Sequence, residues 1–576
     1  KKKVDAEVVA LDSDLADGPR PRLHKLVVRN FRSIGSAPVE IELDDVVILV
    51  GPNNAGKSSI LRAYQVVMSH GSKEGRLVTE DFHNGIVASG FLPEIELHTI
   101  IHSNAPGERW ISKLTSGELL IRERWIWESP NKDPVRQGFD VQKNNWDDEV
   151  PWGAPNIANA RRPLPHRIDA FDPPDVQAKA IADIVTSKLK EKIQGIRTNP
   201  DQQKSDYELI LDSIRDLQTK AVVETEVEIQ EIEAEISKYL EKLFPNHRVK
   251  FDPRADSDID KAFTPFRGTT DVLMGASGGH FSAISHQGSG ARRTLLWAVL
   301  KCISEREGAT SGRPHVLLLD EPEICLHPIA IREARAVLYG LPESGKWQVM
   351  MTSHSPIFID LSRDNTTVVR VFRADDGVKS TTLYRPSRAK LSDDDKRNMK
   401  LLNLCDPYVN EFFFGGRQII VEGDTEFTAF AMLRERYPSD YQDVQIIRAR
   451  GKGVIPSIAK ILLQFSKQFS VLHDSDDKKT ESGATNPAWT MNNNIAAVLD
   501  FENAGDGVKL VACKKNFEDA LFGLEAKNEK PYAALQRLRS DEGACKRVKQ
   551  LLDCLLDPNV PPPENCVRWK KIADLE

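Results

Sequence analysis

Residues 46–59 read VVILVGPNNAGKSS, an apolar stretch followed by a glycine-rich turn and the start of a helical pattern. The turn at 51–58 fits GxxxxGK[ST] and stands between a strand and a helix, which is the context that this motif needs. Backbone N–H groups of such a loop and the following helix N-terminus attract phosphate. We expect Lys57 to reach the β- and γ-phosphates of ATP and Ser58 to bind Mg²⁺. The other loop residues expected at the nucleotide are Asn53, Asn54, Gly56 and Ser59.

A second apolar stretch, VLLL at 316–319, ends in Asp320 and Glu321. An apolar strand that delivers two carboxylates beside a phosphate loop is a Walker B arrangement. Asp320 is expected to hold Mg²⁺ through water, and Glu321 to orient or deprotonate the attacking water. A strand that simply ends in an acidic turn is common. The Walker B interpretation is therefore supported mainly by the phosphate-loop motif at 51–58.

Three further segments indicate the subtype of ATP site. They are similar to an ABC signature loop, a D-loop and a switch-histidine loop, and they read SHQGSGARR at 285–293, LHP at 326–328 and TSHSP at 352–356. The five motifs follow the order found in an SMC/ABC ATPase head. The sequence therefore resembles such a head more closely than a chance collection of polar turns.

That resemblance gives roles to individual residues. His354 is expected to sense the γ-phosphate, although a single histidine at a strand end is usually only a polar surface residue. Ser289 and Gly290 would complete the ATP site of a second subunit, so the ATPase would be at least a dimer. The sequence offers no convincing Q-loop glutamine, and Asp81 in TEDFHNG is the weak candidate substitute.

Four carboxylates predict a second site. The strand-like IIV at 419–421 ends in Glu422, Glu426 opens a helical stretch, and FSVLHDSD ends in Asp474 and Asp476. The i, i+2 spacing places Asp474 and Asp476 on one face of an extended strand. Four carboxylates at one edge of a parallel sheet repel one another unless cations lie there, and oxygen ligands suit Mg²⁺ or Mn²⁺.

This pattern resembles the TOPRIM fold of topoisomerases, bacterial primases and some nucleases, in which a glutamate ends one strand and a DxD pair a later one. Acidic caps on a generic doubly wound domain are the less favoured interpretation. The segment RARGKG at 448–453 matches the glycine-rich stretch of TOPRIM proteins. Its basic residues would meet DNA phosphates, but a solvated turn explains them nearly as well.

The pattern along the chain predicts an ATPase in two parts, with Walker A at 1–175 and the signature, Walker B and switch histidine at 246–390. Between them, 176–245 is expected to be helical, because apolar residues recur every three or four positions in its last part. This helix either packs on its own domain or dimerises, and both remain open. The TOPRIM domain is placed at 391–576, and the Pro-, Asn- and Asp-rich 129–175 is expected to be a long surface excursion.

Bulk composition decides little. The 576 residues are 40% apolar and 28% charged, which is ordinary for a globular protein, and the net charge of −7 still allows a local basic groove. Seven dispersed cysteines fit a reducing cytosol. We find no apolar run of about 18 residues and no secretory signal, so we expect a cytoplasmic protein without a transmembrane helix. A separate membrane partner is also not expected, because of the fused TOPRIM pattern.

The motifs GPNNAGKSS, HQGSGARR, LLLDEPE, TSHSP, IIVEGDTE and LHDSD, in this order, resemble the OLD (overcoming lysogenisation defect) nuclease family over 23–576. The length and the late lysines look most like class 2 members, including the nuclease subunit of the Gabija antiphage system. The resemblance implies an α/β protein with an SMC/ABC-type ATPase head, a helical dimerisation insert and a C-terminal TOPRIM nuclease domain. It also implies a two-metal site and a UvrD-like helicase partner. The family's metal ligands fall on Glu422, Glu426, Asp474, Asp476 and Glu518, and its catalytic lysine on Lys570 or Lys571.

The leading hypothesis is therefore an ATP-binding, divalent-metal-dependent DNA endonuclease in antiphage defence or DNA processing. An ATP-gated, SMC-like DNA clamp without nuclease activity is the main alternative, and the complete EGxxxE and DxD set argues against it. The fused TOPRIM pattern argues against the ATPase subunit of a membrane transporter. A primase or a topoisomerase remains open. Taken alone, Glu518 and the late lysines would be ordinary surface residues.

Overall fold

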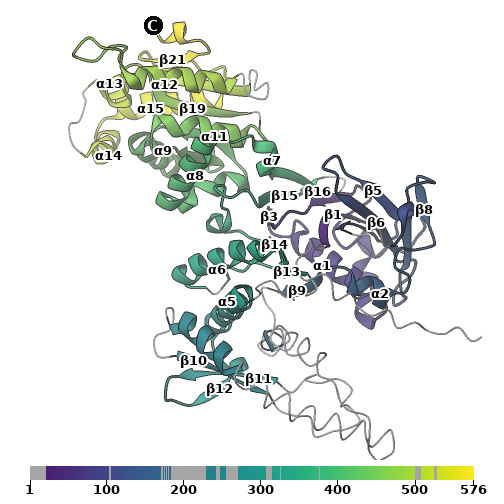
Figure 1. Ribbon diagram of the computed structural model, residues 1–576. Coiled ribbons are helices and arrows are strands. Elements are labelled where there is room, and N and C mark those ends of the chain that lie inside the picture. Colours follow the sequence, from purple (N-terminus) through teal and green to yellow (C-terminus); the bar gives the residue numbers. More distant parts are fainter. Residues whose placement is uncertain are drawn as a thin grey trace, which may run out of the picture. The chain divides into compact units, whose positions relative to one another are not determined.

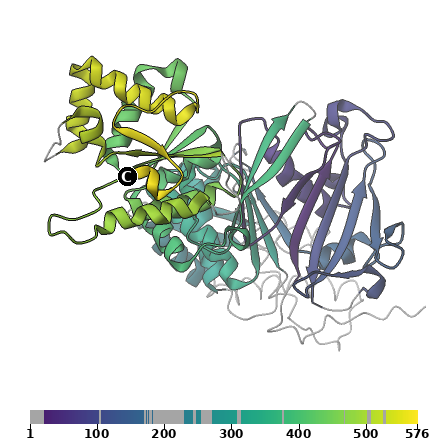
Figure 2. The same cartoon turned by 90° about the horizontal axis from the view of Figure 1, so that it is seen from above.

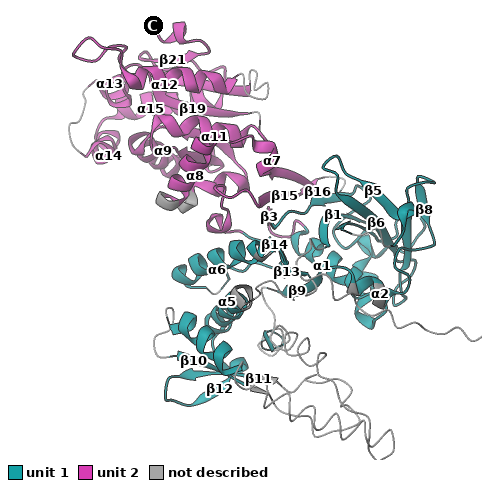
Figure 3. Cartoon of the chain, in the orientation of Figure 1, with its two compact units in different colours: residues 1–46, 56–353, 375–378 teal, residues 47–55, 354–374, 379–576 magenta. Residues whose placement is uncertain are grey.

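The computed structural model divides into two compact units, shown in Figure 3: 1–46, 56–353 and 375–378 in the first, and 47–55, 354–374 and 379–576 in the second. The predicted domain boundaries remain predictions. Apart from five isolated positions between 173 and 182, the structure describes residues 21–102, 106–169, 229–241, 247–253, 270–306, 314–324, 326–374, 377–466, 468–499, 507–523 and 529–576.

The first unit contains a seven-stranded antiparallel sheet in the order β2-β1-β4-β6-β7-β8, with β5 paired to β6. Its strands are β1 (Arg22–Arg29), β2 (Val39–Glu42), β4 (Glu94–Ile101), β5 (Ile111–Lys113), β6 (Leu119–Ile126), β7 (Val135–Asp140) and β8 (Asn145–Asp147). Figure 2 shows them side by side in purple and blue.

The predicted surface excursion at 129–175 is wrong. Strands β7 and β8 extend the antiparallel sheet, and α2 (Pro155–Ala160) and β9 (Leu164–Ile168) follow them. Strand β9 pairs in parallel with β13 (His315–Leu319), which pairs in parallel with β14 (Trp347–Thr352). Several prolines and asparagines of this segment, including Pro130, Asn131, Asn144 and Pro151, lie in turns between these elements.

A buried charge cluster fixes the same segment. Glu123 on β6 accepts hydrogen bonds from Arg136 at 2.6 and 2.9 Å and from Arg162 at 2.5 and 3.1 Å. Arg136 also donates to the carbonyl oxygens of Pro151 and Gly153. A buried charge is tolerated when it is paired and fully hydrogen-bonded. The cluster thus ties the chain after β8 to the sheet.

The rest of the first unit carries the ATPase motifs. Its helices are α1 (Lys57–Met68), α5 (Ser289–Arg306) and α6 (Pro328–Gly340), and a small antiparallel sheet is formed by β10 (His247–Pro253), β11 (Thr270–Ala276) and β12 (Phe281–Ala283). Most of the predicted helical insert at 176–245 lies outside the described residues. Its part at 229–241 is helical, with Ile229, Ile236 and Leu240 buried.

The second unit includes most of β3 (Val46–Val50), β15 (Thr366–Ala374) and β16 (Gly377–Tyr384), in the order β16-β15-β3. Its other sheet has the order β18-β17-β19-β20-β21. These strands are β17 (Arg417–Val421), β18 (Val444–Arg448), β19 (Phe469–Asp474), β20 (Val508–Cys513) and β21 (Cys566–Trp569). The first four strands in that order are parallel, and β21 is antiparallel to β20.

Helices surround this five-stranded sheet (Figure 1). They are α7 (Pro386–Ala389), α8 (Asp393–Cys405), α9 (Asp424–Arg436), α10 (Pro438–Tyr441), α11 (Ile455–Leu462), α12 (Pro487–Ala496), α13 (Phe517–Phe522), α14 (Lys530–Ser540) and α15 (Glu542–Leu556). Ile419, Val421, Leu472 and Val511 pack with residues of α9, α13, α14 and α15 in one apolar core. This is a mixed α/β fold, and in parallel sheets of this kind functional residues gather at the carboxyl ends of the strands.

No helix among the described residues is both long enough and apolar enough to cross a membrane.

Candidate functional site

Two glycines in the 51–58 loop adopt conformations that require glycine. Gly51 has a φ of 143° and Gly56 a φ of 94°. A Cβ on Gly51 would lie 1.9 Å from the carbonyl oxygen of Val371, and one on Gly56 would lie 2.8 Å from Ser33 Oγ. Gly56 is also the N-cap of α1, so the N-terminus of that helix begins directly after the loop, as a phosphate-binding loop requires.

The structure brings the predicted Mg²⁺ residues of the ATPase motifs together. Ser58 Oγ donates a hydrogen bond to Asp320 Oδ1 at 3.0 Å. The hydroxyl of Thr352 donates to the same oxygen at 2.6 Å and accepts from the N–H of Glu321 at 2.9 Å. Thr352 is fully buried at the end of β14. Sequence reasoning missed this residue, although it is the first letter of TSHSP.

Lys57 lies among carboxylates. Burial lowers its pKa below the ordinary value, and Glu321, Asp320 and Glu323 oppose that effect, in this order of size. A buried ammonium close to three carboxylates, at a helix N-terminus, suits a triphosphate with its Mg²⁺.

The other predicted ATPase residues occupy less decisive positions. Ser289 and Gly290 begin α5 and are half-buried, and His354 follows β14 with its side chain exposed. The carboxylate of Asp81 accepts a hydrogen bond from Arg32 Nε at 2.8 Å. Their roles at a nucleotide stay predictions.

Five predicted carboxylates gather at the carboxyl ends of β17, β19 and β20. They are Glu422 after β17, Glu426 in the first turn of α9, Asp474 and Asp476 at and after the end of β19, and Glu518 in the first turn of α13. The N–H of Asp474 donates to Glu422 Oε2 at 3.1 Å, which joins two strand ends directly. Parallel strands thus collect residues that are up to 96 positions apart, from Glu422 to Glu518.

The carboxylates perturb one another. Burial is the largest cause that raises the pKa of Asp474 well above its usual value, and the other four carboxylates add to it. Burial, reinforced by Glu422 and Glu518, raises the pKa of Glu426 to about 7. Burial also raises the pKa of Glu422. Such a group of like charges favours the binding of cations.

Besides Glu422, protein donors hold three more of these carboxylates. Glu426 Oε2 accepts from the N–H of Gly423 at 3.1 Å, and Glu518 Oε1 accepts from Thr425 Oγ1 at 3.2 Å. Asp476 Oδ2 accepts from Lys452. Accordingly, within the described part of the chain, no three His, Cys, Asp or Glu side chains converge on one point as metal ligands would. Metal binding therefore requires some of these side chains to rotate.

The donor set nevertheless fits a divalent cation. Asp474 Oδ1 is buried and has no hydrogen-bond partner among the described residues, so an acceptor is available inside the group. All five side chains offer carboxylate oxygens, the ligands that Mg²⁺ and Mn²⁺ prefer.

Lys452 of the segment RARGKG lies in the carboxylate group, a position that the sequence did not predict. The sequence favours DNA contacts or, nearly as well, a solvated turn for the basic residues of this segment, but Lys452 is buried. Its ammonium bonds the Asp476 carboxylate and the carbonyl oxygen of Ala488, the latter at 3.2 Å. Arg448 pairs with Asp406 and Asp424. The position of Lys452 after β18, a parallel strand, is the signal that could have found it.

Lys570 and Lys571 are not brought to the carboxylates by the sheet. Strand β21 is antiparallel, with Cys566 opposite Cys513 and Trp569 opposite Leu510. The chain therefore leaves β21 toward the edge where β20 begins, away from the edge where Asp474 ends β19. Both lysines are exposed. Their predicted catalytic role stays a prediction.

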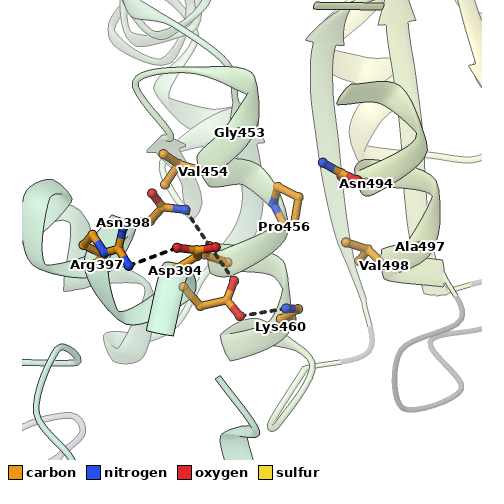
Figure 4. A pocket seen from close by; sticks show the side chains of 12 residues that line it. Asp394, Arg397, Asn398, Gly453, Val454, Pro456, Lys460, Asn494, Ala497 and Val498 are labelled. Atoms are coloured by element: carbon orange, nitrogen blue, oxygen red, sulfur yellow. Dashed lines mark hydrogen bonds and ion pairs between the residues drawn. The ribbon is translucent and has the colours of Figure 1, made fainter. Parts of the chain in front are cut away.

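A pocket of about 640 Å³ lies beside the glycine-rich turn at 448–453, between residues of α8, α11 and α12 (Figure 4). Its charged side chains are paired within the pocket wall: Lys460 donates to Asp395 at 2.7 Å, and Arg397 lies 3.3 Å from Asp394. None of the five carboxylates lines it. It is a separate feature from the carboxylate group.

Comparison with known proteins adds the family. Residues 46–360, more than half of the chain, match the family described as "AAA domain, putative AbiEii toxin, Type IV TA system". The chain belongs to this AAA-domain family. Residues 413–476 match the model described as "Overcoming lysogenization defect protein-like, TOPRIM domain". That second match contains four of the five carboxylates.

Two curated relatives match along most of their length. The OLD nuclease of Thermus scotoductus is 24% identical over 466 residues, 79% of this chain and 82% of that protein. The Old nuclease of Escherichia phage P2 is 23% identical over 472 residues, 79% of this chain and 77% of that protein. Together with the two family models, these relatives support a nuclease enzyme with an ATPase domain.

Two solved structures are also similar to this chain. The Pyrococcus furiosus Smc head domain bound to the C-terminal domain of ScpA has a TM-score of 0.37 and 15% identity, covering 67% of this chain and 99% of that one. The SMC head domain of Thermotoga maritima has a TM-score of 0.31 and 13% identity, covering 63% of this chain and 98% of that one.

The expected class 2 or Gabija subtype remains a prediction.

Proposed function

We propose that this protein is an ATP-binding, divalent-metal-dependent DNA endonuclease, and that Glu422, Glu426, Asp474, Asp476 and Glu518 form its two-metal site. The observation that carries the proposal is the gathering of these five carboxylates at one sheet edge, where burial and mutual repulsion raise the pKa of Asp474 and Glu426. Bound Mg²⁺ or Mn²⁺ would supply an activated water and neutralise charge on the phosphate.

The chain's own residues provide the frame for that chemistry. Glu422 and Asp474 are already joined by a hydrogen bond between two neighbouring strand ends, so they are pre-positioned as ligands. Glu426 and Glu518 sit in the first turns of their helices, from which a change of rotamer turns a carboxylate toward the strand ends. Asp474 offers the buried oxygen without a hydrogen-bond partner among the described residues.

For the ATPase part, we propose that Lys57, Ser58 and Asp320 hold ATP and its Mg²⁺, and that Glu321 orients the attacking water. The contact between Ser58 and Asp320 supports this assignment. His354 would sense the γ-phosphate. Residues of the signature loop would act on the ATP of a second copy, which makes the working form at least a dimer.

The biological setting rests on the family resemblance. We propose a cytoplasmic protein that acts on DNA in antiphage defence, with a UvrD-like helicase as a partner. The helicase part of the proposal is tested by its own experiment, co-purification with a helicase encoded nearby.

The nuclease proposal is tested with supercoiled plasmid, Mg²⁺ or Mn²⁺, and the wild-type chain with and without ATP. Glu422→Ala and Asp476→Ala should lose nicking and keep ATP binding, because both residues belong to the carboxylate group. Glu435→Ala and Asp477→Ala remove exposed carboxylates from α9, the helix that follows Glu422, and from the loop that carries Asp476; they are the matched controls and should nick normally.

Two results would count against the proposal. Full nicking by both Glu422→Ala and Asp476→Ala would refute the site. A wild-type chain that binds DNA in an ATP-dependent way but nicks no plasmid with any divalent metal would favour the clamp without nuclease activity.

A further inference from the structure

Among the described residues, a buried cation, Lys452, lies in the carboxylate group. Lys452 lies in the turn after β18, and its side chain is only 3% exposed. Its ammonium is held from two sides, by the carboxylate of Asp476 and by the carbonyl oxygen of Ala488 at the start of α12. A lysine is rarely buried to this degree unless it is paired.

The charge of Lys452 also acts on a second carboxylate of the group, Glu422. Besides its contact with Asp476, the ammonium lowers the pKa of Glu422 and so opposes the effect of burial there. Another lysine, Lys530, lies 3.7 Å from Glu518, but its side chain is 39% exposed. Water therefore screens Lys530 much more than Lys452.

The loop that carries Asp476 is shaped without help from Lys452. Main-chain bonds run from the N–H of Ser475 to Cys513 O at 2.8 Å and from the N–H of Asp476 to Lys515 O at 3.1 Å. Asn492 Nδ2 donates to the carbonyl oxygen of Ser475 at 2.9 Å. The left-handed φ of 60° at Asp476 is thus fixed by the neighbouring strand and helix. A role for Lys452 in building this loop is not needed.

We propose that Lys452 is a tethered counter-ion that occupies the cation position beside Asp476 in the metal-free protein, and that a divalent ion must displace its ammonium to bind there. This inference rests on the proposed metal-dependent function. The Asp476 side chain is 29% exposed, so an ion can approach it from solvent while the lysine is still bound. Lys452 then has two effects: it limits self-repulsion in the metal-free site, and it raises the metal concentration at which the site fills.

The test is calorimetric titration of the full-length protein with Mn²⁺ alone, without DNA or ATP. Lys452→Met and Lys452→Gln remove the charge and should bind Mn²⁺ at least about tenfold more tightly, since a unit charge at contact distance is removed from a partly desolvated site. Lys452→Arg keeps the charge and should stay within about threefold of the wild type. Lys514→Met removes an exposed lysine near the same sheet edge and should leave affinity unchanged.

Thermal unfolding gives a second reading. The neutral variants should melt below the wild type without metal, and Mn²⁺ should raise their melting temperature by more than it raises that of the wild type. Lys452→Gln retains a hydrogen-bond donor, so it tests the charge even where Lys452→Met does not fold.

The two proposals fail in different ways. If the wild type shows no Mn²⁺ binding that Glu422→Ala abolishes, the metal-dependent function itself is overturned. If the wild type binds Mn²⁺ at this site but both neutral variants bind it equally or more weakly, Lys452 is not a competing counter-ion, and the metal-dependent function stands.

Discussion

Thr352→Val is expected to weaken binding of ATP with Mg²⁺ while leaving the fold intact. Valine has nearly the shape of threonine and lacks only the hydroxyl. That hydroxyl is fully buried, donates to Asp320 Oδ1 at 2.6 Å and accepts from the N–H of Glu321 at 2.9 Å. The substitution therefore acts on two consecutive residues of the Walker B motif through one atom.

The size of the effect follows from those two bonds. A hydrogen bond to a charged group contributes about 1.5–3 kcal/mol, and a buried N–H left without a partner costs about 1–3 kcal/mol. Asp320 keeps its bond from Ser58, so part of its orientation survives. We expect a loss of roughly 1.5–3 kcal/mol in binding of Mg²⁺·ATP, which is about a 10- to 100-fold rise in Kd.

The assay is fluorescence titration with a labelled ATP analogue, in Mg²⁺ and in EDTA. The matched control is Thr99→Val on β4, which removes a buried hydroxyl that has no hydrogen-bond partner among the described residues. Thr99→Val should bind Mg²⁺·ATP like the wild type. The reasoning is refuted if Thr352→Val also binds normally, or if the two variants lose affinity equally.

Two stability predictions concern the antiparallel sheet. Glu123→Ala takes the carboxylate partner from two buried guanidinium groups and should destabilise the first unit by about 3–5 kcal/mol in urea unfolding, so a loss below 1 kcal/mol would contradict the buried cluster. Burial alone would raise the pKa of Glu96, but hydrogen bonds from His98 and Arg122 lower it to about 2. The pKa of Glu96 is lower in the folded protein than the value of 4.5 in the unfolded chain. Its carboxylate therefore stabilises the folded state above pH 4.5, and this stabilisation is lost as the pH falls toward 2. Glu96→Gln should therefore cost about 2 kcal/mol at pH 6 and clearly less at pH 3, and a cost independent of pH would exclude this origin.

The nucleotide loop and the carboxylate edge could be predicted because both depend on local pattern. Ser58 and Asp320 each stand at a fixed place in a short motif, so their meeting follows once the motifs are accepted. Residues 129–175 could not be predicted in this way. Their strands are three to six residues long, and a cluster around Glu123 holds them from positions 13 and 39 residues away. A sequence pattern within a few neighbouring residues gives no information on contacts between residues so far apart in the chain.

The assignment of the lysines shows what topology adds to motif order. In a parallel sheet every strand delivers its following residue to the same edge, so a residue after β18 or β20 can meet Glu422 and Asp474 whatever its distance in sequence. A residue after an antiparallel strand leaves at the other edge. Lys452 follows β18 and reaches Asp476, whereas Lys570 follows β21, whose register with β20 runs the opposite way. Distance from the motif did not separate these lysines; the contact of Lys452 with Asp476 makes Lys452 the first lysine to test.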